Sequence, residues 1–320
     1  MAKEFNARIY TTHFLEKDGF YEDMKNRVVN TGITFGRFEK IKSVEMLIRL
    51  NTRCDVDADF HIYSLIPPRF EAVTNKVPFL YYAHQYSTYG LPNYTLQKIA
   101  HRYLIKPEHI IANSNHVSNR LALLYGCRPR AIIYPPLRLN EFYHKKSEDF
   151  YLTVSRLENW KRIDLQITAF RNSGKKLVIV GDGPDKHRLE TIACAHNSNV
   201  NFLGRVSDRE LRDLYARCTA FIFTSRDEPL GLAPVEALAS GKPILCISEG
   251  GPLEYLNDGK NCLLFNDATQ LREIIDNCKP KTLDAMESEC LKSASKFDSN
   301  TIFAKMRECI AEIIDEGTYS

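Results

Sequence analysis

The sequence contains neither a run of eighteen apolar residues nor a secretory signal pattern. A membrane-spanning helix needs about twenty mostly apolar residues, so the sequence predicts a chain that stays in the cytoplasm without crossing a membrane. The nine cysteines are odd in number and include no close C-x-x-C pair, which argues against both a disulfide framework and a zinc site. We expect most of them to be small core residues with reduced thiols.

Neither charge nor apolar content is scarce. With 44% hydrophobic and 26% charged residues, the 320-residue chain has the composition of a folded enzyme of about two domains. Residues 1–150 carry 21 Lys or Arg against 15 Asp or Glu, whereas the rest carry 22 against 25. The basic half can attract phosphates or anionic lipid head groups, although a solvated surface of mixed charge explains the same count.

Short apolar runs alternate with helical patterns through the second half of the chain. The predicted strands are Phe150–Val154, Lys176–Val180, Val200–Leu203, Thr219–Phe223 and Pro243–Ile247. The predicted helices are Ile163–Arg171, Pro184–His196 and Asp208–Arg217, with a further Ala/Leu-rich helix between the last two strands. Strands that alternate with helices of about ten residues form βαβ units, so the sequence predicts an α/β fold with a parallel sheet.

The first half repeats this alternation less regularly. Its predicted strands are Arg8–Thr11, Phe60–Tyr63, Pro78–Tyr82, His109–Ala112 and Ala131–Tyr134, and its predicted helices are Val44–Leu50, Leu96–Leu104 and Val117–Tyr125. A polar stretch before Phe150 predicts a boundary between a domain of residues 1–140 and one of residues 150–298. The tail, residues 299–320, contains an amphipathic pattern from Asn300 to Ile314, and we expect a helix that packs on the nearest domain or crosses back to the first.

Two glutamates, Glu228 and Glu236, lie eight positions apart in the segment that joins strand Thr219–Phe223 to the following helix. One carboxylate lies in the turn and the other on the helix. Open α/β sheets bind ligands at the carboxyl ends of their strands, and a helix amino terminus favours phosphate. The pair is therefore typical of a site for a ligand with hydroxyl and phosphate groups.

Other polar or glycine-rich turns follow neighbouring strands. Arg156 and Lys161, which come after Phe150–Val154, are spaced to clamp a diphosphate, although exposed cations near a loop are commonly just solvated. The turns at Gly183 and Gly204 end two further strands, where small residues let a ring or phosphate approach the backbone. Their shared position at one edge of the sheet indicates a single site.

In order and spacing, these motifs resemble the nucleotide-sugar domain of family 4 retaining glycosyltransferases. The resemblance rests on Ser-Arg-Leu at 155–157 with Lys-Arg-Ile-Asp at 161–164, Val-Gly-Asp-Gly-Pro at 180–184, Phe-Leu-Gly at 202–204, Glu-Pro-Leu-Gly-Leu at 228–232 and Gly-Gly-Pro-Leu-Glu at 250–254. The first half is similar through Tyr-Tyr-Ala-His at 81–84, Ile-Ala-Asn-Ser at 111–114 and Ile-Tyr-Pro-Pro at 133–136. The resemblance implies the GT-B fold, two doubly wound Rossmann-like domains that face a cleft.

The resemblance also implies a role for each residue that occupies a matching position. The resemblance implies that Arg156 and Lys161 hold the diphosphate of the donor, that Glu236 accepts hydrogen bonds from the ribose and that Glu228 faces the transferred sugar. It implies that His84 lines the reacting centre, although His84 could also be a core histidine. Glu228 could instead act as a nucleophile or ion stabiliser, and Glu236 could be a first-turn helix acid.

Further positions complete the implied donor site. The resemblance implies that the loops at Gly183 and Gly204 surround the base and ribose, that Leu232 contacts the donor, and that neither a metal nor a separate cofactor takes part. Four histidines match no motif and are interpreted as structural or surface groups: His61, His101, His109 and His116.

One departure from the family pattern concerns the first domain. Members usually begin with an apolar strand and a Gly-Gly turn, whereas Arg8–Thr11 resembles the second strand of the family and no Gly-Gly occurs in residues 1–150. We therefore expect a first domain without its first strand, with residues missing upstream, another segment in that place, or a weakened transferase. Because the first strand of a doubly wound sheet is central, its absence would leave a gap.

The leading hypothesis is a retaining glycosyltransferase that moves a hexose, with mannose as the first choice, from a GDP- or UDP-linked sugar to a glycan or polyprenyl-linked acceptor. The basic first domain suggests peripheral contact with the cytoplasmic face of a membrane, and we expect no nucleic-acid partner. The alternatives are a nucleotide-sugar-binding protein without transfer and a UDP-sugar 2-epimerase of the same fold.

Overall fold

The computed structural model of the protein describes residues 9–11, 28–30, 61–64, 79–83 and 107–315. His84 and the predicted helices Val44–Leu50 and Leu96–Leu104 lie outside the described residues. The chain divides into two compact units. The first comprises Met1–Asn113, Val117–Ile133 and Phe303–Ser320, and the second comprises Ser114–His116 and Tyr134–Ile302.

The second unit is built on a parallel sheet of six strands, in the spatial order β12-β11-β10-β7-β8-β9. The strands are β7 (Phe150–Val154), β8 (Lys176–Val180), β9 (Val200–Gly204), β10 (Ala220–Phe223), β11 (Ile244–Ile247) and β12 (Cys262–Phe265). The chain adds β7, β8 and β9 in one direction, then returns to place β10 beside β7 and continues in the other direction. The predicted parallel α/β sheet is confirmed, and its strand order reverses between β7 and β10.

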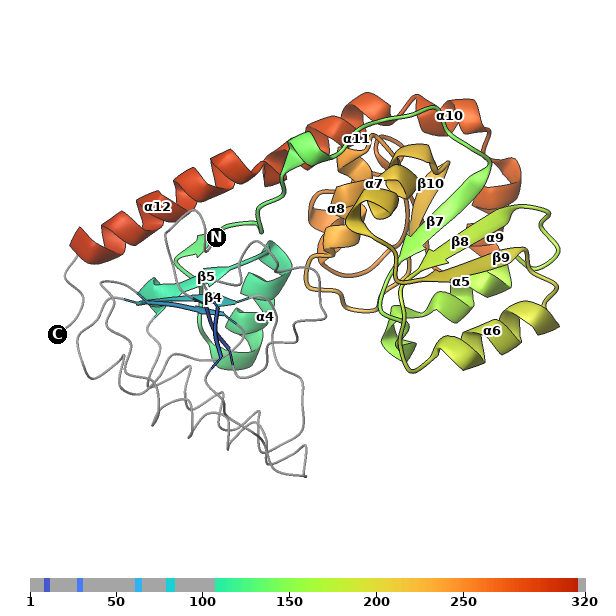
Figure 1. The fold of residues 1–320 in the computed structure, drawn as a ribbon. Coiled ribbons are helices and arrows are strands. Elements are labelled where there is room, and N and C mark those ends of the chain that lie inside the picture. The colour runs from blue at the N-terminus through green and yellow to red at the C-terminus, as the bar shows by residue number, and fades with distance from the viewer. Residues whose placement is uncertain (1–8, 12–27, 31–60, 65–78, 84–106, 316–320) are drawn as a thin grey trace. The chain divides into compact units, whose positions relative to one another are not determined.

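Helices cover both faces of this sheet (Figure 1). One group, whose members pack on each other, comprises α5 (Ile163–Ala169), α6 (Lys186–Ala195) and α9 (Ala268–Asn277). The other comprises α7 (Asp208–Arg217), α8 (Leu232–Ala239) and α11 (Glu287–Ala294), while the short α10 (Pro280–Asp284) precedes α11. Strands β10 and β11 are apolar along their whole length and fully buried, as expected for a sheet covered on both sides.

Helix α7 shows how local sequence sets an element's bounds. Ser207 has an extended backbone, and its hydroxyl accepts a hydrogen bond from the backbone N–H of Glu210. Acidic Asp208 and Glu210 lie in the first turn and Arg217 in the last, where they complement the helix dipole. Both bounds of this helix agree with the prediction.

The described strands of the first unit form two parallel sheets. Strand β1 (Ile9–Thr11) pairs with β2 (Val28–Asn30). Four further strands form the other sheet: β3 (His61–Ser64), β4 (Phe79–Ala83), β5 (Ile110–Ala112) and β6 (Ala131–Ile132). No hydrogen-bonded ladder joins the two sheets among the described residues.

Helix α4 (Asn115–Tyr125) follows β5 and buries Val117 and Leu121 in the core of the first unit. The chain ends with α12 (Ser299–Asp315), which confirms the predicted amphipathic helix. It begins in the second unit and continues into the first, where Met306 and Ile313 are buried and Glu312 pairs with Arg130 at 2.9 Å.

Six of the eight described cysteines are buried, as expected for small core residues. Burial raises the pKa of the Cys218, Cys262 and Cys290 thiols to about 12, so these groups stay protonated and unreactive at neutral pH. Within the described residues, no helix is both long and apolar enough to span a membrane.

The turns after β7 and β8 lie in direct backbone contact. The N–H of Ser155 donates to the carbonyl of Val180, and the N–H of Leu157 donates to the carbonyl of Asp182, each at 3.0 Å. Gly181 has a φ of +127°, and a Cβ there would collide with the carbonyl of Ser155. Glycine at 181 is therefore required by both conformation and space.

Replacing Gly181 with alanine should destabilise the second unit by about 3–5 kcal/mol, because the turn must shift away from Ser155. Gly174→Ala is the matched control, since Gly174 also has a positive φ (+68°) but a Cβ there would meet nothing within 4 Å; it should cost about 1–2 kcal/mol. Denaturant unfolding measures both, and equal losses would contradict the steric argument.

Candidate active site

The reversal of strand order places the carboxyl ends of β7 and β10 side by side. The loop after β7 passes through a short 3-10 helix (Asn159–Lys161), and the loop after β10 leads into α8. In open α/β sheets, the crevice at such a reversal is the usual place for a ligand. The side chains that these two loops present are therefore the first candidates for a site.

Hydrogen bonds hold the two loops together. The backbone N–H of Arg226 donates to the carbonyl of Trp160 at 3.0 Å, and the hydroxyl of Thr224 donates to the carbonyl of Lys161 at 2.8 Å. The buried amide of Gln166, on α5, donates to the Thr224 hydroxyl at 2.8 Å. These bonds tie the loops to the sheet and to the helix below it, so the side chains that they carry are fixed from several directions.

A salt bridge joins the loops at their tips. The ammonium of Lys161 lies 2.6 Å from the Oε2 atom of Glu228, and the two side chains are only 13% and 15% exposed. The same ammonium lies 3.9 Å from the centre of the Trp160 ring, within range of a cation–π contact. An anion that entered here would compete with Glu228 for the Lys161 charge.

Arg156 is the second cation of the loop after β7. Its side chain is 72% exposed, and its guanidinium lies 3.1 Å from the Oε1 atom of Glu158. The other oxygen of Glu158 accepts a hydrogen bond from the indole N–H of Trp160. The loop thus carries both predicted cations, each beside its own carboxylate.

Glu236 lies on α8 and faces different partners from Glu228. The hydroxyl of Tyr215, on α7, donates to its Oε2 atom at 2.8 Å. Burial raises the pKa of Glu236, and the Tyr215 hydrogen bond opposes part of that rise. Because Glu236 is the fifth residue of α8, whose first turn holds no acid, the interpretation as a first-turn helix acid is wrong.

The two glycines of the predicted site serve the backbone. Gly183 packs against the backbone of Leu157, with which a Cβ would collide. Gly204 ends β9 with a φ of +68°, and its carbonyl accepts from the N–H of Gly181 at 2.7 Å. Both lie at the same sheet edge as Lys161, and a Cβ at 204 would meet nothing within 4 Å.

Leu232 opens α8 and is 45% exposed, which is unusual for a large apolar side chain at a helix start. Helix α8 begins directly after Gly231, three positions beyond Glu228, and no side chain caps its amino terminus. An exposed apolar group next to unpaired donors is compatible with ligand contact.

The loop after β11 closes the site on a third side. Gly251 donates its N–H to the carbonyl of Glu228 at 2.7 Å. Glu249 pairs with Arg162 at 3.1 Å, which connects this loop to the one after β7. Three neighbouring strand ends therefore contribute to one connected arrangement.

The sequence interpretation missed three residues of this arrangement. Ser114, Asn115 and His116 follow β5, yet they belong to the second unit and contact the loops around Glu228. His116 had been interpreted as a structural or surface group. Ser114 ends the Ile-Ala-Asn-Ser motif at 111–114, to which no role was assigned, and the signal for Asn115 and His116 was the polar run Asn-Ser-Asn-His directly after a buried strand.

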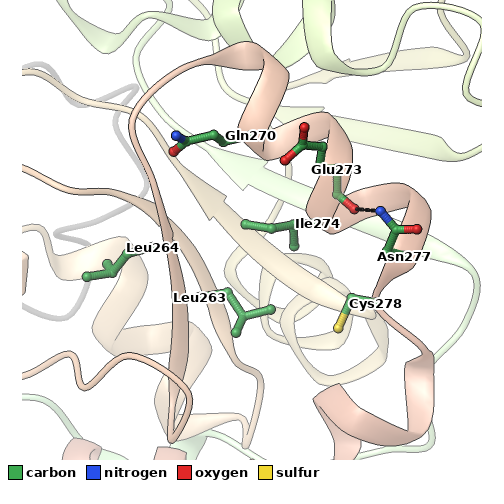
Figure 2. Close-up of a pocket in the computed structure, with 7 residues that line it drawn as sticks. All are labelled: Leu263, Leu264, Gln270, Glu273, Ile274, Asn277 and Cys278. Carbon is green, nitrogen blue, oxygen red and sulfur yellow. Dashed lines mark hydrogen bonds between the residues drawn. The ribbon is translucent and has the colours of Figure 1, made fainter.

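A surface groove lies elsewhere, between β12 and α9 (Figure 2). Its lining residues are Leu263, Leu264, Gln270, Glu273, Ile274, Asn277 and Cys278, none of which belongs to the predicted site or carries a positive charge to bind phosphate. Among the residues that the structure describes, no three His, Cys, Asp or Glu side chains gather as a metal site would require.

The second unit has a parallel sheet that helices cover on both faces, and polar side chains lie where its strand order reverses. These features define the class of Rossmann-like α/β domains. In sequence, residues 139–281 match the family described as Glycosyl transferases group 1, so this part of the chain is similar to that family.

Two relatives illustrate the sequence similarity. An uncharacterized glycosyltransferase, MJ1178, of Methanocaldococcus jannaschii is 30% identical over 172 residues, which are 52% of this chain and 48% of that protein. The O-antigen chain mannosyltransferase RfbU of Salmonella typhimurium is 25% identical over 216 residues, 63% of this chain and 58% of that protein. The matches thus span about half the length of these relatives.

Solved structures share the fold. HepE of Anabaena, in complex with UDP-glucose, matches with a TM-score of 0.73 and 19% identity over 98% of this chain and 93% of that chain. Sucrose-phosphate synthase from Thermosynechococcus elongatus matches with a TM-score of 0.73 and 16% identity over 91% and 84%. These matches confirm the predicted GT-B fold class.

Trp160 is the only tryptophan of the chain, so its fluorescence reports on the Lys161–Glu228 pair. Lys161→Ala should change its emission in the ligand-free protein, because the ammonium over the ring is removed. Lys175→Ala removes a surface lysine that pairs with Asp149 at 3.5 Å and is the matched control. An unchanged spectrum in the Lys161 variant would rule out the stacking geometry.

Proposed function

We propose that the protein is a retaining glycosyltransferase that moves a hexose from a nucleotide diphosphate sugar to an acceptor hydroxyl. The observation that carries the proposal is the Lys161–Glu228 pair at the strand-order reversal, with Arg156 on the same loop. This arrangement offers two cations for a diphosphate and one carboxylate for a sugar. Its family 4 pattern and the similarity of residues 139–281 to Glycosyl transferases group 1 support the same activity.

In the proposed reaction, the bond between the anomeric carbon and the diphosphate oxygen breaks while the acceptor oxygen bonds to that carbon. Positive charge develops on the sugar and negative charge on the departing diphosphate. Lys161, Arg156 and the amino terminus of α8 stabilise the negative charge as it forms. The acceptor proton passes to an oxygen of the departing diphosphate, which thereby serves as the base.

Glu228 faces the transferred sugar in this proposal. The diphosphate replaces Glu228 as the partner of Lys161, which leaves the carboxylate next to the positive charge that develops at the anomeric carbon. It stabilises this charge electrostatically, or it attacks the carbon as a nucleophile in the alternative retaining mechanism. His84 would line the same centre from the first domain.

Glu236 receives the nucleotide ribose. Its Oε2 atom is oriented by Tyr215, and its other oxygen accepts the ribose hydroxyl protons. The loops at Gly183 and Gly204 would border the base and ribose, and the exposed side chain of Leu232 would cover the donor. No resident cofactor or metal enters the proposal.

The names of relatives guide the choice of substrates. Several are mannosyltransferases, including RfbU and the GDP-mannose-dependent alpha-mannosyltransferase of Corynebacterium glutamicum, which supports mannose from GDP-mannose as the first choice. HepE with UDP-glucose supports a UDP-linked donor instead. For the acceptor we propose a glycan or polyprenyl-linked chain at the cytoplasmic face of a membrane, consistent with the basic first 150 residues.

Incubation with GDP-mannose, UDP-glucose and UDP-N-acetylglucosamine tests the activity. We expect release of GDP or UDP from one donor, faster with a polyprenyl-linked or glycan acceptor than with water. Nucleotide binding in a calorimeter without release from any donor would favour the alternative, a binding protein without transfer. Neither binding nor release by the folded protein would refute the proposed function.

The two glutamates should respond differently to substitution. Glu236→Ala should weaken nucleotide affinity about 10- to 100-fold, because the half-buried acceptor of the ribose hydrogen bonds is lost. Glu228→Gln should lower kcat about 10²- to 10³-fold and change affinity little, because its charge acts on the transition state. Calorimetry and steady-state kinetics separate the effects, and equal loss of affinity in both variants would contradict the division of roles.

A further inference from the structure

Glu228 belongs to a turn whose two flanking residues are both held by one distant segment. The imidazole Nε2 atom of His116 lies 2.9 Å from the Oδ1 atom of Asp227. The hydroxyl of Ser114 donates to the carbonyl of Pro229 at 2.8 Å. These contacts, made 111 and 115 positions away along the chain, hold the turn on both sides of the carboxylate.

The turn needs such support. Asp227 has a φ of +47°, a left-handed conformation that costs free energy for any residue except glycine and is better tolerated by Asp and Asn. Pro229 has no backbone N–H, so it cannot be fixed by donating a hydrogen bond of its own. The side chains of His116 and Ser114 supply hydrogen bonds to the residues on the two sides of Glu228.

A third residue fixes the segment itself. The Oε2 atom of Glu254 accepts from the backbone N–H of Asn115 at 2.9 Å and from its amide at 2.6 Å. The hydroxyl of Tyr134 donates to the same oxygen at 3.2 Å. Asn115 is thereby held between Ser114 and His116.

The contacts form a closed ring around Glu228. Glu254 ends the 3-10 helix Gly251–Glu254, and the N–H of Gly251 donates to the carbonyl of Glu228 at 2.7 Å. The ring runs from Glu228 through Gly251 and Glu254 to Asn115, and returns through His116 and Ser114 to the two neighbours of Glu228. Such closed networks are more rigid than their separate bonds.

We propose that His116 and Ser114 are positioning residues, which fix the turn so that the Glu228 carboxylate stays beside Lys161 and the reacting sugar. They act through Asp227 and Pro229 and need not touch the substrate. The inference rests on the proposed transfer reaction, in which a carboxylate displaced by about 1 Å loses much of its effect.

The variants His116→Ala and His116→Gln test the proposal. The alanine variant removes the bond to Asp227, whereas glutamine places an amide donor near the position of Nε2. His144→Ala is the matched control, because His144 is similarly buried (30% against 22% exposed) and lies 3.6 Å from Glu287, away from the site.

We expect His116→Ala to lower kcat about 10- to 100-fold, with the nucleotide dissociation constant within about twofold of the wild type, a change of at most about 0.4 kcal/mol. Glutamine should restore most of kcat, and His144→Ala should leave it unchanged. Ser114→Ala should resemble His116→Ala. A His116→Ala enzyme as fast as the His144→Ala control, or a glutamine variant as slow as alanine, would overturn the proposal.

Amide hydrogen exchange provides a readout that does not depend on turnover. A peptide covering residues 226–231 should exchange faster in His116→Ala than in the wild type, and at the wild-type rate in His116→Gln and His144→Ala. Unchanged exchange in His116→Ala would refute the positioning role even if the protein transferred no sugar. The proposed function is tested independently, by the turnover of the wild type with each donor. A failure of the proposed function can therefore be distinguished from a failure of the positioning role.

Discussion

The reversal of strand order between β7 and β10 is the constraint on which the site depends. These strands end at Val154 and Phe223, far apart in the chain, and become neighbours because the chain returns to the middle of the sheet before it extends the other way. The helices that follow them, α5 and α8, belong to the two different groups that cover the sheet, and a reversal of this kind is the usual place for a ligand. Lys161 and Glu228 meet there only because of this topology. The hydrogen bonds from Thr224 to Lys161, from Arg226 to Trp160 and from Gly251 to Glu228 support these two loops.

In the ligand-free protein, each predicted donor cation has a carboxylate partner of its own. Lys161 pairs with Glu228 in a partly buried position, and the exposed Arg156 pairs with Glu158. An ion pair offsets the free-energy cost of removing its charges from water, and it also holds the two side chains in place. A diphosphate can take over both cations by exchange, without leaving either of them buried and alone. Binding of the diphosphate then costs the free energy of two ion pairs, Lys161–Glu228 and Arg156–Glu158. Of the two carboxylates released, the proposed reaction uses that of Glu228.

The features that could be predicted from the sequence are those that depend on a local residue pattern or on a position at the end of a strand. The bounds of α7 follow from Ser207 and its acidic first turn, and Arg156, Lys161, Glu228 and Glu236 were found because each follows or borders a predicted strand. Between β11 and the predicted C-terminal helix no element was predicted, although β12 and its helix α9 lie there. His116 and Tyr215 were missed for another reason. Their roles arise from single hydrogen bonds to Asp227 and Glu236, and neither pattern nor spacing encodes such pairs.

The two glutamates show how one short segment supports two kinds of chemistry. Glu228 stands in a turn beside an ammonium, where its charge is matched and remains available to oppose charge that develops nearby. Glu236 is half-buried on the following helix, where the loss of water contact raises its pKa and a tyrosine hydroxyl already satisfies one oxygen. A carboxylate in that setting can accept hydrogen bonds from further hydroxyl groups, because each hydroxyl supplies a proton to share and brings no additional charge. The two glutamates, eight positions apart in the sequence, are thus suited to different tasks. Glu228 is suited to opposing a charge that develops nearby, and Glu236 is suited to accepting a hydrogen bond from a sugar hydroxyl. The difference lies in their surroundings, because the side chains are the same.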